Sequence, residues 1–339
     1  MTRVAVIGTG AMGANHVRVY REMPDVELVA IVDKDQAKAE SVSKPYHVPA
    51  YDNYLEMLER EQPQAVSIVV PTVMHYTVTR DCLEAGCHVL VEKPLAASLE
   101  HAGELIETAE QLERVLMVGH IERYNPAITE LKRQLTAGKL GRVFQIHTRR
   151  LGPFPTRVHD VGVVMDLATH DLDIMRYLTG SEAVRVYAET RRELHPVHED
   201  LFAGMLRFED GTLGTLEINW LTPAKIREVY VTGERGMYRV DYITQDLHFF
   251  ENAEANGDDW AAMHLLRGVS EGSVTKFAIH KREPLRAELE AFIAKIQGSG
   301  SLVANGHDGY AAMSLACAMA DSAASMTVKL LYSETHIPT

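Results

Sequence analysis

The chain has 339 residues, of which 46% are hydrophobic, and its formal net charge at pH 7 is −13. This length allows a large core and favours two domains over one. The acidic balance argues against a nucleic-acid partner, which requires a basic face, and against binding to an anionic membrane surface.

The three cysteines, Cys82, Cys87 and Cys317, fit neither a zinc site nor a disulfide framework, so we interpret them as reduced thiols. The N-terminus enters a strand pattern directly and lacks the shape of a signal peptide. No apolar run reaches the roughly 18 residues of a membrane span. These features predict a soluble cytoplasmic protein.

The first 120 residues alternate between apolar runs typical of strands and patterns typical of helices. Strands are predicted over residues 3–7, 28–32, 65–70, 88–91 and 115–118. Helices are predicted over residues 11–23, 35–43, 54–61, 75–85 and 98–113. Such alternation implies right-handed crossovers and a parallel sheet, and near-continuous apolar strands fit a sheet covered on both faces. We therefore predict an α/β domain over residues 1–120.

After residue 120 the pattern becomes strand-rich. A helix within residues 125–141, a strand over 142–151 and a helix over 162–178 come first. Strands are then predicted over residues 184–191, 203–208, 212–220, 226–232, 237–241 and 246–250, and helices over 284–297 and 310–331. Asp210-Gly211 between two strand runs is a strong hairpin signal. This order predicts a second, α+β domain over residues 121–339 with a mostly antiparallel, open sheet.

An open sheet of this kind would leave a large apolar face uncovered. Monomers rarely expose such a patch, so we expect the second domain to bind another copy of the chain as well as the substrate. The expected assembly is a homodimer or, as the stronger expectation, a homotetramer.

The stretch GTGAMG, residues 8–13, stands between a predicted strand and a predicted helix, which is the context that a dinucleotide-binding G-x-G-x-x-G motif needs. Gly8 permits a tight turn, Gly10 lets a pyrophosphate approach the backbone, and Gly13 allows the helix to pack closely on the strand. The pyrophosphate then lies at the helix N-terminus, where we expect Ala11 and Met12 to contact the cofactor as well.

The second predicted strand ends at Asp33, 20 residues after the last glycine of that motif. A carboxylate there can accept hydrogen bonds from both ribose hydroxyls of the adenosine and would repel a 2′-phosphate, so it favours NAD over NADP. Lys34, beside it, weakens that preference. The alternative is a glycine turn that serves only packing, with Asp33 as a helix N-cap.

Ligands bind at the carboxyl edge of a parallel sheet, and two more segments end there. Pro71 and Thr72 follow the strand predicted over residues 65–70 and are expected to line the adenosine or nicotinamide-ribose region. His75 is either a pocket residue or the start of the next helix. Glu92-Lys93-Pro94 follows the strand predicted over residues 88–91, so Lys93 should point at the bound dinucleotide, and we expect both Glu92 and Lys93 to contact this cofactor.

A lysine so placed can take a proton from a substrate alcohol or stabilise the developing alkoxide by its charge. A nearby cationic nicotinamide and partial burial would lower the pKa of Lys93, whereas Glu92, where close, would raise it. The alternative is a surface lysine in a turn.

The stretch GVVMDLATHDLDIM, residues 162–175, carries Asp166, His170 and Asp173 at helical spacing, so the three share one face of an otherwise apolar helix. A histidine flanked by carboxylates suits general acid–base catalysis, because one carboxylate fixes the tautomer while the other ring nitrogen faces the substrate. The alternatives are a structural hydrogen-bond network and a metal site. Zinc needs further ligands, and none is suitably spaced, so we predict no metal.

With these motifs in this order, nearly the whole chain resembles the glucose–fructose oxidoreductase / inositol dehydrogenase (Gfo/Idh/MocA) family. The resemblance implies a Rossmann domain that binds NAD(P) and a second α/β domain with an open sheet. It implies that Lys93 and His170 act on a substrate hydroxyl and that Asp166 supports them. It also implies a cis peptide bond before Pro94.

Residues 119–127 and 149–175 are similar to the UDP-N-acetylglucosamine 3-dehydrogenase branch of this family. That branch implies oxidation of the sugar C3 hydroxyl to a ketone, which an aminotransferase converts to an amine in the synthesis of 2,3-diamino sugars, for example of lipid A. Inositol and other free-sugar dehydrogenases share the larger motifs. A non-catalytic NAD-binding sensor on the same fold is a further alternative.

A UDP-sugar carries a diphosphate, which arginine is well suited to bind. Arg123 and Asn125 follow the last strand of the first domain and are expected to contact the substrate. Arg157, in the stiff loop GPFPTR, is a further candidate. Arg149 and Arg150 alternate along a strand, so only one of them can face the substrate.

Overall fold

The computed structural model of the chain describes residues 1–155, 162–253, 271–300 and 304–331. The chain divides into two compact units. The first comprises Met1–Tyr124 and Arg282–Ser314, and the second comprises Asn125–Lys281 and Leu315–Thr339. Each unit has its own sheet and its own buried apolar side chains.

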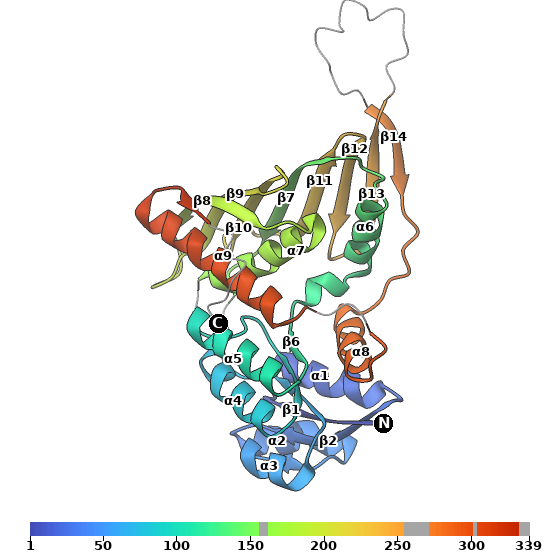
Figure 1. Cartoon of the computed structure of the whole chain (residues 1–339), viewed down its shortest axis with the longest axis vertical. Coiled ribbons are helices and arrows are strands. Elements are labelled where there is room, and N and C mark those ends of the chain that lie inside the picture. The colour runs from blue at the N-terminus through green and yellow to red at the C-terminus, as the bar shows by residue number, and fades with distance from the viewer. Residues whose placement is uncertain (156–161, 254–270, 301–303, 332–339) are drawn as a thin grey trace, which may run out of the picture. The chain divides into compact units, whose positions relative to one another are not determined.

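The first unit is built on a parallel six-stranded sheet with the strand order β3-β2-β1-β4-β5-β6. Figure 1 labels β1, β2 and β6 of this sheet. Its strands are β1 (Thr2–Ile7), β2 (Val26–Val32), β3 (Ala50–Tyr51), β4 (Ala65–Ile68), β5 (His88–Val91) and β6 (Leu116–Val118). Its first five helices are α1 (Ala11–Glu22), α2 (Gln36–Ser43), α3 (Tyr54–Glu61), α4 (Thr72–Glu84) and α5 (Leu99–Gln111). The predicted parallel α/β domain is confirmed.

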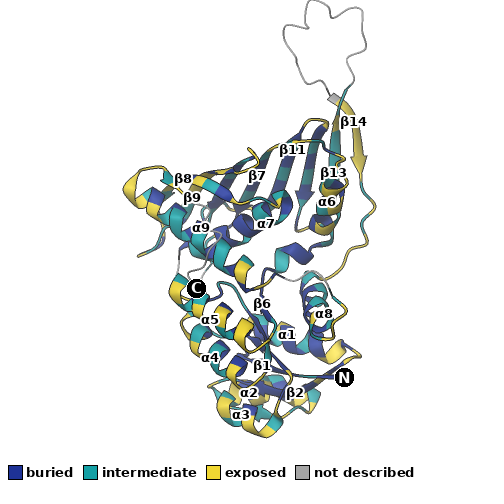
Figure 2. Cartoon of the chain, viewed as in Figure 1, coloured by how far each residue is buried: buried dark blue, intermediate teal, exposed yellow. Residues whose placement is uncertain are grey.

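Helices cover both faces of this sheet, which is why its strands are apolar almost throughout. Side chains alternate between the faces of a strand. Val4 and Val6 of β1 therefore belong to the core formed with α1, whereas Ala5 and Ile7 belong to the core formed with α3, α4 and α5. Figure 2 shows the strands as buried and the outer surfaces of α3, α4 and α5 as exposed.

Helix α8 (Pro284–Ile296) also belongs to the first unit, although the sequence places it in the predicted second domain, 121–339. Its buried side chains Leu289 and Phe292 pack in the same core as Val17 and Tyr20 of α1. The structure thus differs from the predicted division at residue 120. The first segment ends four residues later, at Tyr124, and a second segment returns from the C-terminal part of the chain.

The second unit contains a nine-stranded sheet with the order β14-β13-β12-β11-β7-β10-β9-β8-β15. Its strands are β7 (Val143–Leu151), β8 (Ala183–Arg191), β9 (Leu201–Phe208), β10 (Leu213–Asn219), β11 (Ile226–Gly233), β12 (Gly236–Asp241), β13 (Asp246–Asn252), β14 (Glu271–Lys276) and β15 (Lys329–Leu330). Among the described strands all neighbours are antiparallel except β7 and β10. The predicted mostly antiparallel sheet and the β9–β10 hairpin at Gly211 (φ +89°) are confirmed.

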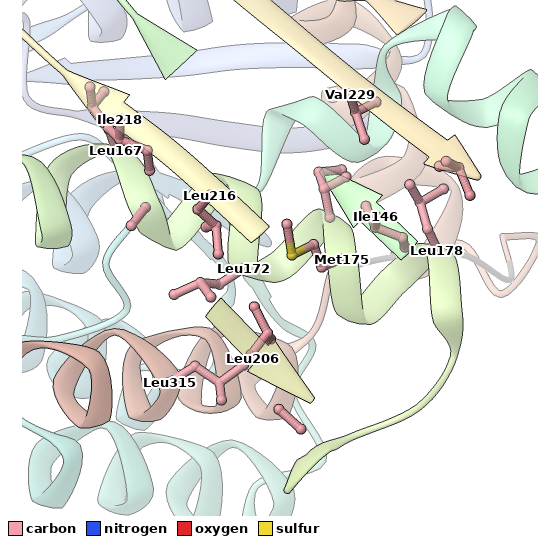
Figure 3. Close-up of a cluster of buried hydrophobic side chains, with 14 of the residues drawn as sticks. Ile146, Leu167, Leu172, Met175, Leu178, Leu206, Leu216, Ile218, Val229 and Leu315 are labelled. Atoms are coloured by element: carbon pink, nitrogen blue, oxygen red, sulfur yellow. The ribbon is translucent and has the colours of Figure 1, made fainter. Parts of the chain in front are cut away.

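One face of this sheet packs against helices α6 (Pro126–Thr136) and α7 (Thr169–Thr179) and against the later turns of α9 (Gly306–Ser325). Leu172 and Met175 of α7 point toward Leu216 of β10, and Leu315 joins them from α9 (Figure 3). The sheet therefore supplies a rigid base for α7. The helix predicted over residues 310–331 ends earlier, at Ser325, because Lys329 and Leu330 pair with β8 instead.

The other face of the sheet differs from the expected apolar patch. It carries a shallow groove lined mainly by polar side chains, namely Gln145, His147, Arg149, Thr215, Tyr230, Thr232 and Met237. Arg149 pairs with Glu217 at 2.9 Å across this face. The predicted apolar patch is therefore wrong over the groove. The homodimer or homotetramer stays a prediction without that support, to be measured by light scattering.

Candidate active site

The turn after β1 requires glycine at two positions. Gly8 has φ +102°, and a Cβ atom there would lie 2.2 Å from the carbonyl oxygen of Val69. A Cβ atom at Gly13 would lie 1.9 Å from the carbonyl oxygen of Gly8. Backbone cannot yield to such contacts, so the chain turns sharply from β1 into α1 at the carboxyl edge of the sheet.

Gly10 is different, because a Cβ atom there would meet no atom of the described chain within 4 Å. Gly10 is the N-cap of α1 and has no side chain with which to cap the helix. It and Ala11 are exposed, whereas Met12 is half-buried. The first N–H groups of α1 thus face an open space, and the helix dipole favours an anion there. This arrangement fits a pyrophosphate.

Asp33 lies at the end of β2 and is tied to the glycine turn. Its Oδ2 accepts hydrogen bonds from the N–H of Thr9 at 2.9 Å and from the Thr9 hydroxyl at 2.6 Å, and its Oδ1 accepts one from the N–H of Asp35 at 3.0 Å. Burial raises the pKa of Asp33, but these hydrogen bonds outweigh it and leave the pKa below its ordinary value. The carboxylate is therefore charged and half-buried beside the turn, as a ribose-binding acid needs to be.

The predicted alternative for Asp33, a helix N-cap, is wrong. The N-cap of α2 is Asp35, whose side chain accepts from the N–H of Lys38. Lys34 is exposed. Thr9 was missed by the sequence reasoning, although a hydroxyl between the first two glycines of the motif was the signal available. Together the turn, the helix N-terminus and Asp33 fit NAD.

Helix α4 begins at the same edge, directly after β4. Pro71 is its N-cap and is exposed, and Thr72 is its first residue and is half-buried. His75, one of the predicted cofactor contacts, is only 1% exposed. Its two ring nitrogens lie 2.7 Å from Pro94 O and 2.9 Å from Val70 O. The structure thus places His75 inside the first unit, behind the edge.

Glu92-Lys93-Pro94 follows β5, two strands along from β1, so it begins about 10 Å from the glycine turn at the usual strand spacing. The peptide bond between Lys93 and Pro94 is cis, as the resemblance implied. Lys93 is half-buried. The carboxylate of Glu92, another predicted cofactor contact, lies 3.2 Å from Nε2 of His16 in α1.

The two residues expected to contact the substrate after β6 are buried instead. Arg123 is 5% exposed, and its guanidinium lies 3.0 and 3.1 Å from the carboxylate oxygens of Asp308. Asn125 is 2% exposed, caps α6 by accepting from Ala127 N, and donates to Tyr242 O at 3.0 Å. Both side chains thus make structural contacts. Arg157 lies outside the described residues.

The helix predicted over residues 162–178 has two parts. A π-helical turn, Val164–Ala168, precedes α7. Asp166 lies in the π-helical turn and His170 in the first turn of α7, and both are half-buried. Asp173 is 1% exposed and does not share this partial exposure. Such widened turns are frequent at functional sites.

This segment is fixed at its start by the loop between β8 and β9. The N–H of Val163 donates to Glu199 O at 3.1 Å, and that of Val164 donates to the Glu199 carboxylate at 3.2 Å. A Cβ atom at Gly162 would lie 2.0 Å from the same carboxylate, so the contact requires glycine. Sequence reasoning missed Glu199, because its partner lies 35 residues away.

A buried ion pair fixes α7 to the sheet. Arg150 of β7 is 4% exposed and donates to Asp171 at 2.7 and 3.2 Å. Asp171 directly follows His170, so the pair holds the helix where His170 emerges. Arg149 and Arg150 lie on opposite faces of the sheet, as their alternation predicts, since Arg150 faces the helices and Arg149 lines the groove. Which of them contacts the substrate stays a prediction.

Within residues 1–155, 162–253, 271–300 and 304–331, no group of three or more His, Cys, Asp or Glu side chains is placed to hold a metal ion. In the same ranges, no helix has the length and apolar character needed to cross a membrane.

Comparison with known proteins gives matches to both units. Residues 2–120 match the sequence model of an oxidoreductase family with an NAD-binding Rossmann fold, and residues 128–239 match the GFO/IDH/MocA C-terminal domain. These matches confirm the predicted fold class and the predicted NAD cofactor.

Individual relatives agree over most of the chain. UDP-N-acetylglucosamine 3-dehydrogenase of Acidithiobacillus ferrooxidans is 30% identical over 294 residues, which are 87% of this chain and 88% of that protein. Its solved structure superposes with a TM-score of 0.83 at 28% identity, covering 95% of this chain and 98% of the other. scyllo-Inositol 2-dehydrogenase (NAD(+)) of Bacillus subtilis is 31% identical over 232 residues, 65% of this chain and 68% of that protein.

Proposed function

Because the chain belongs to the Gfo/Idh/MocA oxidoreductase family, we propose that it oxidises the C3 hydroxyl of UDP-N-acetylglucosamine to a ketone. It is an NAD-dependent oxidoreductase, and a sugar is the substrate class that its relatives support. The finer choice rests on the Acidithiobacillus relative, which matches 87% of the chain. A ketone at C3 is a substrate for an aminotransferase, so the proposed pathway leads to 2,3-diamino sugars of the lipid A type.

The observation that carries the proposal is the position of Lys93. It follows β5 at the carboxyl edge of the parallel sheet, two strands from the glycine turn. Bound NAD supplies the hydride acceptor for the carbon–hydrogen bond that breaks. The chain must then remove the hydroxyl proton. A neutral Lys93 amine or the His170 imidazole can take it, and a charged Lys93 ammonium can stabilise the alkoxide.

We assign the supporting role to Asp166. It precedes His170 by four residues, and a carboxylate that accepts from one ring nitrogen fixes which nitrogen takes a proton. The buried pair of Arg150 and Asp171 restricts the motion of α7 and so limits the positions that the His170 ring can adopt.

A second candidate substrate is a free polyol such as myo-inositol, and one observation favours it. The side chain expected on the diphosphate, Arg123, is buried against Asp308, and Arg150 is buried against Asp171. The inositol relative from Bacillus subtilis is also 31% identical.

A non-catalytic NAD-binding sensor is the alternative from another functional class, and it requires that the chain turns over none of the candidate compounds.

A substrate panel separates these functions. The purified chain with NAD is given UDP-N-acetylglucosamine, N-acetylglucosamine, UDP-glucose or myo-inositol, and NADH is followed by its absorbance. UDP-N-acetylglucosamine and N-acetylglucosamine differ only in the nucleotide. UDP-N-acetylglucosamine and UDP-glucose differ only at C2 of the sugar. We expect turnover of UDP-N-acetylglucosamine alone. Turnover of myo-inositol instead would replace the proposed substrate. NAD binding with no turnover of any compound would favour the sensor.

A further inference from the structure

Two buried histidines contact the neighbours of Lys93, one on each side of it. His16 comes from α1 and is 0% exposed, and His75 comes from α4 and is 1% exposed. Their contacts reach Glu92 and Pro94, the residues immediately before and after Lys93. Neither ring is open to a ligand, so any role they have in the reaction must act through these neighbours.

His16 restrains Glu92. Its Nε2 lies 3.2 Å from Glu92 Oε1. The other carboxylate oxygen lies against Gly119, where a Cβ atom would be 2.9 Å from Oε2. His16 is itself held by an edge-on contact with Tyr20, whose hydroxyl hydrogen bonds to Ser67 of β4 at 2.8 Å. The carboxylate of Glu92 is thus confined between α1 and Gly119, the residue that follows β6.

His75 restrains Pro94. Its Nδ1 lies 2.7 Å from Pro94 O, and its Nε2 lies 2.9 Å from Val70 O. Both partners are carbonyl oxygens, which only accept hydrogen bonds, so a neutral ring can donate to one of them and only the charged ring to both. Burial lowers the pKa of His75, while the two carbonyls and Glu92 raise it and Lys93 lowers it. The net pKa is lowered, which favours the neutral ring, and the proposal takes the shorter contact, from Nδ1 to Pro94 O, as the hydrogen bond that this ring donates.

We propose that His16 and His75 are positioning residues, which fix Glu92 and Pro94 and so orient the ammonium group of Lys93 toward the reacting hydroxyl. The proposal rests on the proposed function, because it assumes that Lys93 acts on the substrate. With Glu92 and Pro94 fixed, the backbone of Lys93 between them has less freedom to move, which narrows the positions open to its amine. Supporting contacts of this kind decide whether a reactive group is held accurately enough for catalysis.

Paired amide substitutions test the proposal, because asparagine and glutamine place their N–H₂ group at different points of the lost ring. The asparagine nitrogen overlies Nδ1 and the glutamine nitrogen overlies Nε2. His75→Asn therefore keeps the donor to Pro94, whereas His75→Gln does not. At the other site the order reverses, since His16→Gln keeps the donor to Glu92 and His16→Asn does not.

We expect kcat to follow this crossed order. His75→Asn and His16→Gln should stay within a few-fold of the parent, whereas His75→Gln and His16→Asn should lose up to about 100-fold, since a misplacement of about 1 Å can cost that much. The assay uses NAD with UDP-N-acetylglucosamine, or with the panel compound that is turned over. KM for NAD and the unfolding temperature should be alike within each pair. If the histidines only stabilised the fold, the substitutions would lower the unfolding temperature, and kcat would not depend on which nitrogen of the ring the amide replaces.

Equal kcat within both pairs would overturn the proposal. Lys93→Ala distinguishes a failure of the positioning role from a failure of the proposed function. Full turnover in that variant would show that Lys93 does not act on the substrate, whatever the histidine variants do. Where a histidine variant does not fold, Gly119→Ala provides the test, since its methyl group displaces the Glu92 carboxylate and leaves both rings in place. We expect Gly119→Ala to lower kcat about tenfold, because a small misplacement of a catalytic group is costly, and to change KM for NAD by less than that. Parent-level kcat there would also overturn the proposal.

Discussion

Lys93 and His170 are single residues, in different units, on which the proposed reaction depends. Lys93→Ala and His170→Ala should each lower turnover by about 100-fold or more, the contribution typical of a positioned proton-transfer group. The affinity for NAD should change little, since neither substitution touches the glycine turn or Asp33. The measurements are kcat by NADH absorbance and the dissociation constant of NAD by calorimetry. The exposed Lys139→Ala and His280→Ala are matched controls. Turnover near the parent's in both test variants would refute the assignment.

Asp33 should determine which dinucleotide binds. Asp33→Asn removes the charge that accepts from the ribose hydroxyls, so we expect NAD affinity to fall about tenfold or more, given about 1.5–3 kcal/mol for hydrogen bonds to a charged group. Binding of NADP relative to NAD should rise. Asp35→Asn removes the same charge two residues away and keeps an equally good N-cap, so it should leave both affinities unchanged. Equal changes in the two variants would mean that net charge, and not the ribose contact, sets the preference.

At the scale of single residues, the sequence was most informative where a motif is local. The three glycines and Asp33 lie within one strand–helix–strand segment, and their spacing alone indicates their use. The burial of Arg123 was not foreseen, because its partner, Asp308, is 185 residues away. A pattern that suggests an exposed cation does not reveal a carboxylate that folding brings beside it.

At the scale of elements, most helices and strands were predicted, whereas β3, β14 and β15 were missed. β5 and α3 have the predicted bounds, whereas β3 and β15 have two residues each and no periodicity to detect. The π-helical turn before α7 was missed for another reason. Its sequence is compatible with an α-helix, and the sequence alone does not show the Glu199 contact that holds its first N–H groups.

The glycine turn can be tested as an element, because two of its glycines serve different purposes. Gly8→Ala adds a methyl group 2.2 Å from a backbone oxygen at φ +102°, so it should lower the unfolding temperature and abolish NAD binding together. Gly10→Ala places its methyl group in open space, so the unfolding temperature should stay the same while NAD binding weakens. Thermal unfolding and calorimetric titration measure the two effects. Unchanged NAD affinity in Gly10→Ala would show that the pyrophosphate does not approach this position.

At the scale of the whole molecule, the division into units was the feature least accessible from sequence. The apolar stripe of α8 shows that this helix is packed, but not against which core. In the structure the helix returns to the first unit, across more than a hundred intervening residues that form most of the second. The NAD-binding unit is therefore discontinuous in sequence, and its stability depends on side chains close to the C-terminal end.

Two buried phenylalanines allow this division to be measured. Phe292 of α8 is 0% exposed in the core of the first unit, and Phe202 of β9 is 1% exposed in the core of the second. Phe292→Ala and Phe202→Ala should each destabilise their own unit by about 3–5 kcal/mol. NAD binds only the folded first unit. At an NAD concentration 100 times its dissociation constant, the free energy of unfolding of this unit in Phe292→Ala should therefore rise by about 2.7 kcal/mol. The unfolding temperature of the second unit in Phe202→Ala should not change. Calorimetric unfolding with and without NAD distinguishes the two. Equal recovery of both variants would show that the two cores unfold as one cooperative body.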